Sequence, residues 1–131
     1  MNNRSDKKYL GIDWGEKRIG LALADGETKM AMPFKTVANV DGVAQIVKSE
    51  QIDMVILGKP VRITDYELKI TNEEYNQFII DLKEKIKVPI ELMDERLTSK
   101  AADALVGNKK TKASRDEIAA MIILQSYLDR I

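Results

Sequence analysis

The sequence predicts an α/β domain in which a five-stranded mixed sheet is flanked by helices. Three strand-like segments at the start of the chain follow one another without a helix between them, which favours an antiparallel meander. Strand-like and helix-like segments then alternate, and this order requires crossover connections with parallel pairing. A length of 131 residues is typical of one domain with its own core, so we expect a single domain over residues 1–131.

The first strands of the predicted meander lie on either side of a glycine turn. Residues 9–13 have strand character and end at Asp13, and Gly15 is expected to supply the positive φ that tight hairpin turns demand. Residues 29–37 predict a third strand, with Pro33 indicating an edge position. The second strand has one bulky face (Ile19, Leu21, Leu23) and one small face that allows close packing (Gly20, Ala22, Ala24).

Two later apolar runs predict the parallel part of the sheet. Residues 54–57 are continuously apolar and are closed by Gly58 and Pro60, which is typical of a strand buried on both faces. Residues 90–93 follow Pro89 and predict the last strand. We therefore expect the first of these two strands to lie inside the sheet.

Four helices are predicted from capping residues and helical spacing of apolar residues. The first carries Val43, Ile46 and Val47 inward, and the second is an amphipathic helix that reaches Ile86. The third is short and stops at Gly107. The expected N-terminal caps are Asp41, Thr71 with Glu74, Thr98, and Ser114 with Glu117.

Composition limits the chemistry that the chain can perform. The chain has no cysteine and no histidine, which removes thiolate nucleophiles, the usual general base and the commonest zinc ligands. Catalysis must therefore use carboxylates, amines or hydroxyls. There are 21 basic and 21 acidic residues, so the global charge gives no argument for a polyanionic partner. Without an apolar stretch of membrane-spanning length or a signal-like N-terminus, we expect a cytoplasmic protein without a membrane partner.

Three acidic residues are predicted to lie at the ends of elements. Asp13 ends the first strand, Asp94 ends the last one, and Asp116 lies in the first turn of the last helix. Ligands of open α/β sheets bind outside the carboxyl ends of the strands. Carboxylates that converge there repel one another unless a cation neutralises them, and Mg²⁺ or Mn²⁺ suits such oxygen ligands and phosphate substrates.

Each acid also has a structural alternative. Asp13 can stabilise a turn, and Asp116 can interact with the helix dipole, which contributes about 0.3–1 kcal/mol. Asp94 or Glu95 can pair with Arg96 as surface charges do. A basic stretch between the last two predicted helices could hold a phosphate backbone or be a solvated connector; its lysines are Lys109, Lys110 and Lys112.

Several motifs resemble the YqgF/RuvX family of Holliday-junction-resolvase-like proteins, which are regarded as pre-16S rRNA nucleases. The motifs lie along nearly the whole chain: residues 10–20, Gly58 with Pro60, residues 94–98, and Asp116 with residues 119–128. The resemblance implies an RNase H-like fold. It also implies a metal-binding catalytic site of Asp13, Asp94 and Asp116, with Glu95 as a contributor.

The chain departs from the family pattern at two places. Residues 59–67 lack the glycine turn that usually follows Gly58, although Glu67 falls where the family often has an acid. Trp14 is also bulkier than the usual residue. Neither departure removes an implied metal ligand.

We expect a divalent-metal-dependent nuclease that acts on structured nucleic acid, in the first place a pre-16S rRNA end during ribosome biogenesis. Expected partners are an RNA precursor or branched DNA and ribosomal precursor particles, bound by a monomer or a homodimer. The basic residues expected to contact phosphates are Lys17, Arg18 and Arg96 together with the three loop lysines.

Three other functions stay open at this stage. One is a DNA four-way-junction resolvase, which favours a symmetric dimer because a junction offers paired strands. Another is a non-catalytic module that binds nucleic acid or ribosomes. An ATPase with an actin-like hairpin is disfavoured because such enzymes close two domains around the nucleotide.

Overall fold

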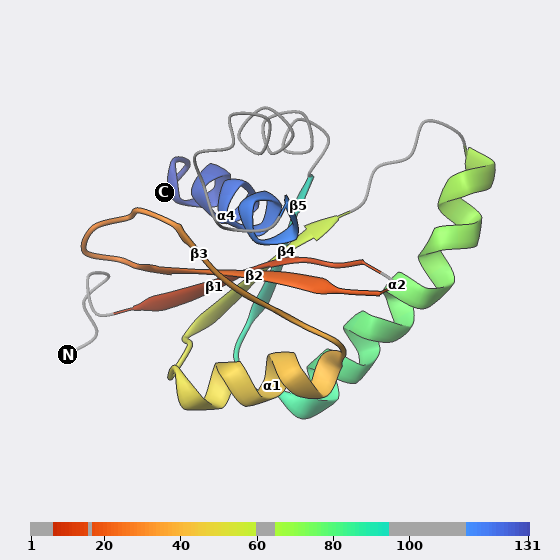
Figure 1. The fold of residues 1–131 in the computed structure, drawn as a ribbon, viewed down its shortest axis with the longest axis horizontal. Helices are drawn as coiled ribbons and strands as arrows, with labels where there is room; N and C mark the ends of the chain where they lie inside the picture. Colours follow the sequence, from red (N-terminus) through yellow and green to blue (C-terminus); the bar gives the residue numbers. More distant parts are fainter. Residues whose placement is uncertain (1–6, 16, 60–64, 95–114) are drawn as a thin grey trace.

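A five-stranded mixed sheet forms the centre of the protein in a computed structural model (Figure 1). The structure describes residues 7–15, 17–59, 65–94 and 115–131, without the side chains of residues 65–72 and 94. The strand order across the sheet is β3-β2-β1-β4-β5. The strands are β1 (Lys8–Asp13), β2 (Ile19–Asp25), β3 (Met32–Val37), β4 (Met54–Lys59) and β5 (Ile90–Asp94).

The sheet combines an antiparallel meander with a parallel half, as the sequence predicts. β2 pairs antiparallel with both β1 and β3, whereas β4 pairs parallel with both β1 and β5. The carboxyl ends of β1, β4 and β5 therefore meet at one edge of the sheet. Asp13 and Asp94 are the last residues of β1 and β5, and they lie at this edge.

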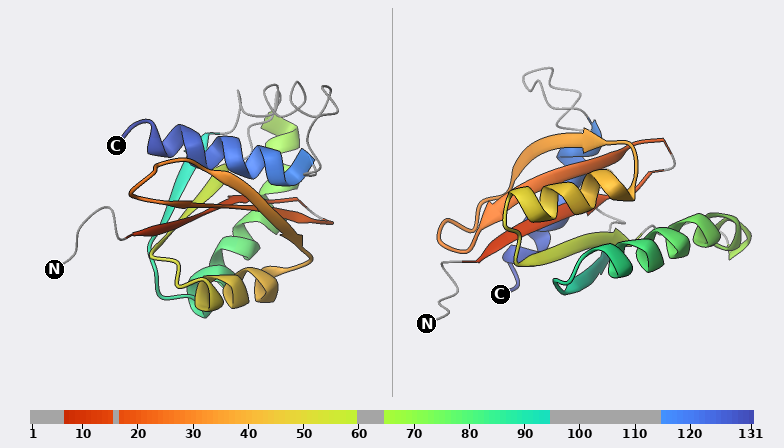
Figure 2. Two further views of the ribbon diagram at one scale, coloured as in Figure 1. Left: turned by 60° about the vertical axis from the view of Figure 1, so that its left-hand side comes forward. Right: turned by 90° about the horizontal axis from the view of Figure 1, so that it is seen from below.

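Helices cover both faces of the sheet (Figures 1 and 2). α1 (Val40–Ser49) and α2 (Asp65–Lys85) lie on one face, and α4 (Arg115–Leu128) lies on the other. The β strands send alternate side chains into the two apolar layers, since Leu10 and Ile12 face α1 and α2, whereas Tyr9 faces α4. None of the described helices is long and apolar enough to cross a membrane.

Two expected strand positions are confirmed. β4 lies between β1 and β5, and Val55, Ile56 and Leu57 are all fully buried, which explains its continuous apolar run. β3 is an edge strand that contains Pro33, where a missing backbone N–H is tolerated.

The starts of β3 and α1 differ from expectation. β3 begins at Met32 rather than at residue 29. The N-cap of α1 is Asn39 instead of Asp41, because Asn39 Oδ1 accepts the backbone N–H of Gly42 at 3.1 Å and Asp41 lies in the first helical turn.

The second helix begins earlier than its capping box predicts. α2 starts at Asp65, so Thr71 and Glu74 lie inside the helix and Glu67 lies in its first turn rather than in a loop. The residues before Thr71 include glutamate, leucine and lysine, which have good helix propensity and extend the helix. The expected helix over residues 98–107 and the Ser114 cap lie outside the described residues.

A pair of leucines tests how burial is distributed across the parallel half of the sheet. Leu57 and Leu92 are register partners, but Leu57 is fully buried and Leu92 is 46% exposed on the edge strand. We expect Leu57→Ala to lower the free energy of unfolding by about 2–5 kcal/mol because it leaves a cavity in the core. Leu92→Ala, the matched control, is expected to cost less than about 1 kcal/mol. Urea denaturation measures both values, and equal losses would contradict the assigned burial.

Candidate active site

The backbone of Asp13 is held between a buried residue and an anchored aromatic ring. Ile12 is fully buried, and Trp14 packs against Tyr75 of α2 with their ring centroids 5.8 Å apart. The Tyr75 hydroxyl donates to the carbonyl oxygen of Gly58 at the end of β4, at 3.0 Å. α2 thus fixes the ends of β1 and β4 from one face of the sheet, and Trp14, although unusual for the family, provides part of that contact.

Gly20 brings the start of α4 against the end of β1. In the register of the sheet, Gly20 of β2 pairs with Asp13. A Cβ atom at Gly20 would collide with the carbonyl oxygen of Asp116 and would lie 2.9 Å from its Cβ. Asp116 therefore rests directly on the residue opposite Asp13, and the predicted small face of the second strand is the surface on which α4 packs.

An ion pair links the turn between β1 and β2 to the first turn of α4. Arg18 Nε lies 3.1 Å from Asp116 Oδ2; the Arg18 side chain is 70% exposed and that of Asp116 is 22% exposed. The start of a helix also favours the negative charge of Asp116 through the helix dipole. Exposed ion pairs of this kind typically contribute only about 0–1 kcal/mol to stability, so the contact can exchange with other partners.

The role of Gly15 differs from the one expected. None of the described glycines has a positive φ, so the turn does not use the conformational freedom of Gly15. A Cβ at Gly15 would instead lie 2.7 Å from the carbonyl oxygen of Arg18. Gly15 therefore permits the turn to fold closely against Arg18, which helps to set the position of that residue.

Gln125 ties α4 to the loop between β2 and β3. Its Oε1 accepts the backbone N–H of Ala31 at 2.8 Å, and its Nε2 donates to the carbonyl oxygen of Lys29 at 3.0 Å. These contacts lie toward the far end of α4 from Asp116. Gln125 belongs to a family-like motif, and its role in this structure is to hold the helix in place.

The structure describes only some of the other expected site residues. The backbone of Asp94 ends β5 opposite Lys59, with β4 between it and Asp13, and Lys17 is exposed beside Arg18. In the described part of the chain, three or more acidic side chains do not gather closely enough to hold a metal. The remaining expected residues lie outside the described ranges: Glu95, Arg96, Lys109, Lys110 and Lys112.

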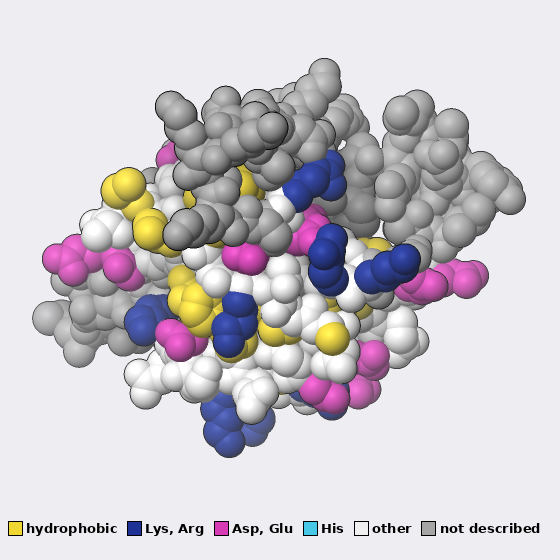
Figure 3. Space-filling view, viewed as in Figure 1, with side chains coloured by type: hydrophobic (Ala, Val, Ile, Leu, Met, Phe, Trp, Pro, Cys, Tyr) yellow, Lys and Arg dark blue, Asp and Glu magenta, His cyan; other side chains and the backbone are white. Residues whose placement is uncertain are grey.

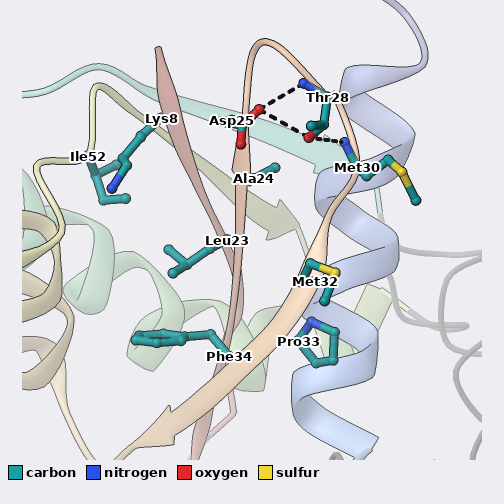
Figure 4. A pocket seen from close by; sticks show the side chains of 10 residues that line it. All are labelled: Lys8, Leu23, Ala24, Asp25, Thr28, Met30, Met32, Pro33, Phe34 and Ile52. Carbon is teal, nitrogen blue, oxygen red and sulfur yellow. Dashed lines mark hydrogen bonds between the residues drawn. The ribbon is translucent and has the colours of Figure 1, made fainter. Parts of the chain in front are cut away.

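Hollows lie at both ends of the first two strands, and one of about 310 Å³ is lined by Trp14 and Gly15, which directly follow Asp13. A pocket of about 430 Å³ lies at the opposite end of β1 and β2, and Lys8, Leu23 and Phe34 are among its lining residues (Figure 4). Asp25 and Thr28 also line it; the backbone N–H and the hydroxyl of Thr28 donate to Asp25 and hold the pKa of that carboxyl below its ordinary value. Asp13 and Asp116 do not line this pocket.

The charge of the surface is mixed. On the face in Figure 3, lysine and arginine side chains lie among acidic ones over the described surface. This arrangement agrees with equal numbers of basic and acidic residues in the sequence. Among the described residues, Lys17 and Arg18 are local basic groups that can attract a polyanion.

A sequence profile of the RuvX family, described as Holliday junction resolvase, matches residues 7–130. The chain belongs to the RuvX family. Among relatives named "Putative pre-16S rRNA nuclease", the protein of Orientia tsutsugamushi is 37% identical over 135 residues, which cover 95% of this chain and 85% of that protein. The protein of Maridesulfovibrio salexigens is 34% identical over 134 residues, which cover 94% and 98%.

Solved structures place this RuvX chain among proteins with a RuvC-like, RNase H-like fold. Thermus thermophilus RuvC, in complex with a Holliday junction substrate, has a TM-score of 0.64 and 14% identity, covering 95% of this chain and 94% of RuvC. The Holliday junction resolvase of fowlpox virus has a TM-score of 0.56 and 18% identity, covering 95% and 99%. At these identities the likeness shows the fold alone, and it confirms the RNase H-like architecture.

A methyl group at Gly20 tests whether its close contact positions Asp116. Gly20→Ala is expected to lower the free energy of unfolding by about 1–3 kcal/mol. The new methyl group meets backbone atoms of Asp116, which cannot move unless α4 moves with them. We also expect faster amide exchange in the first turn of α4, measured by hydrogen–deuterium exchange.

Gly11→Ala is the matched control for this prediction. Its new Cβ would lie 2.7 Å from the carbonyl oxygen of Ala120 and from Leu124 Cβ, so it presses on the same helix farther along. It is expected to destabilise the protein with less effect on the first turn of α4. If both variants change exchange at that turn equally, the contact with Gly20 does not position Asp116.

Proposed function

We propose that residues 1–131 form a single metal-dependent nuclease domain that hydrolyses phosphodiester bonds in structured nucleic acid, with the pre-16S rRNA end as its substrate in ribosome biogenesis. The observation that carries the proposal is the contact of Asp116 with Gly20, opposite Asp13. The contact supports the proposal because it places the backbone of Asp116, from α4, against the residue that pairs with Asp13 at the end of β1. Asp94 ends a parallel strand at the same edge.

The donors at this edge fit a hard divalent cation such as Mg²⁺ or Mn²⁺. Such cations prefer carboxylate oxygens, and the chain contains no histidine or cysteine that would favour zinc. In the proposal Asp13, Asp94 and Asp116 hold the metal, and Glu95 contributes. A bound divalent cation in such a site activates water and stabilises the leaving oxygen of the phosphodiester.

The protein's own residues orient the substrate around these acids. Lys17 and Arg18 are exposed in the turn that follows Asp13, so their charges can meet a phosphate backbone that reaches the acids. Arg96, Lys109, Lys110 and Lys112 add further phosphate contacts in the proposal. Neutralising each phosphate releases counterions, so binding is expected to weaken as salt rises.

RNA is the proposed substrate because the relatives at 34% and 37% identity carry the name of a pre-16S rRNA nuclease. A second candidate is cleavage of a DNA four-way junction, which is favoured by the description of the family and by the RuvC-like fold. A junction offers two symmetric strands, so resolvase activity also requires a homodimer. Substrate preference and oligomeric state together distinguish the two functions.

Asp13→Asn is expected to reduce metal-dependent cleavage by at least about a hundredfold, since the amide keeps the shape of the side chain but loses the charge that holds the cation. We expect the variant to melt no lower than the wild type without metal, because removing one charge relieves repulsion among neighbouring acids. The measurement compares cleavage of structured RNA and of a DNA junction with Mg²⁺ or Mn²⁺.

Asp53→Asn is the control with the same change of charge. Asp53 lies at the other end of β1, where its carboxylate accepts the backbone N–H of Lys8 at 2.8 Å. Its cleavage rate is expected to match the wild type. Equal cleavage by the wild type and Asp13→Asn would reject the assigned site, and binding of RNA without cleavage by any preparation would favour a non-catalytic module.

A further inference from the structure

The ion pair between Arg18 and Asp116 joins two side chains of very different exposure. The Asp116 side chain is only 22% exposed, whereas that of Arg18 is 70% exposed. The more exposed arginine can leave the contact while the carboxylate stays on the helix. The Arg18 guanidinium supplies positive charge to Asp116 at 3.1 Å.

The backbone brings these two residues together. Arg18 directly precedes β2, and Gly20, two residues later, lies against the backbone of Asp116. On the other side of the turn, Gly15 lies close to the carbonyl oxygen of Arg18. The start of β2 and the start of α4 are therefore fixed beside each other, and the arginine reaches the carboxylate from a defined position.

We propose that Arg18 takes the place of the cation at Asp116 in the metal-free protein, and that metal binding displaces it toward a phosphate of the nucleic acid. This inference rests on the proposed function, because it takes Asp116 as a metal ligand. A guanidinium remains protonated throughout the pH range of a folded protein, so Arg18 must move away rather than lose its charge. Arg18 is thus a positioning residue that couples metal binding to substrate binding.

The coupling predicts that removing either member of the ion pair strengthens binding of the ligand of the other member. Loss of Arg18 removes a competitor of the metal and should strengthen metal binding. Loss of Asp116 releases the guanidinium and should strengthen nucleic-acid binding in the absence of metal. An ion pair that serves only stability would not produce this pattern.

The first experiment measures Mn²⁺ affinity without substrate, from the loss of the electron paramagnetic resonance signal of free Mn²⁺. Arg18→Gln is expected to bind Mn²⁺ about two- to fivefold more tightly than the wild type, the range that corresponds to a surface ion pair. Lys17→Gln removes the same charge from the neighbouring exposed residue and is expected to change the affinity less. Arg18→Lys, which keeps the charge, should restore most of the wild-type value.

The second experiment measures binding of a structured RNA in EDTA, where metal-dependent cleavage does not occur. Asp116→Asn is expected to bind RNA more tightly than the wild type, and adding Arg18→Gln should cancel the gain. Glu117→Gln removes the same charge from the next residue in the first turn of α4 and serves as the matched control. A melting curve for each variant checks that it remains folded.

The outcomes separate this inference from the proposed function. Equal Mn²⁺ affinities for Arg18→Gln and Lys17→Gln, or equal RNA affinities for Asp116→Asn and Glu117→Gln, would overturn the role of Arg18. If Mn²⁺ binding then still depends on Asp13, the proposed metal site stands. A wild-type protein that does not bind Mn²⁺ would overturn both proposals.

Discussion

The close approach of α4 to the sheet is the constraint on which the rest of the site depends. Two glycines make it possible: Gly11 admits Ala120 and Leu124, and Gly20 admits the backbone of Asp116. A side chain at either position would hold the helix away from the sheet. The packing that buries the apolar face of α4 against the sheet also sets the position of Asp116 in the first turn of that helix.

Local patterns predicted the parts of the fold that depend on burial alone. The continuous apolar run at residues 54–57 identified an interior strand, and the small face of residues 20–24 identified a surface for close packing. Asn39 rather than Asp41 caps α1. Both residue types are good N-caps, so the sequence alone did not distinguish them; the choice depends on where the chain turns after β3. α2 begins before the predicted cap at Thr71 because the residues that precede Thr71 have good helix propensity.

The role of Asp13, Asp94 and Asp116 as site residues remains a proposal. These three acids were predicted from their places at the ends of elements and from the family resemblance. The ion pair of Arg18 with Asp116 was not, because it joins residues far apart in the sequence through a helix whose docking only the tertiary structure fixes. Glu95, Arg96 and the three loop lysines remain predictions, since they lie outside the described residues.

The order of the acids along the chain determines when the proposed site can form during synthesis. The meander of β1, β2 and β3 forms through contacts between neighbours in the sequence, so it can fold early. Asp116 lies on α4 and reaches Gly20, the register partner of Asp13, only through long-range contacts. A nascent chain that still lacks α4 can thus contain the hairpin without the complete acidic site. The proposed acidic site can therefore form only after α4 has docked on the sheet.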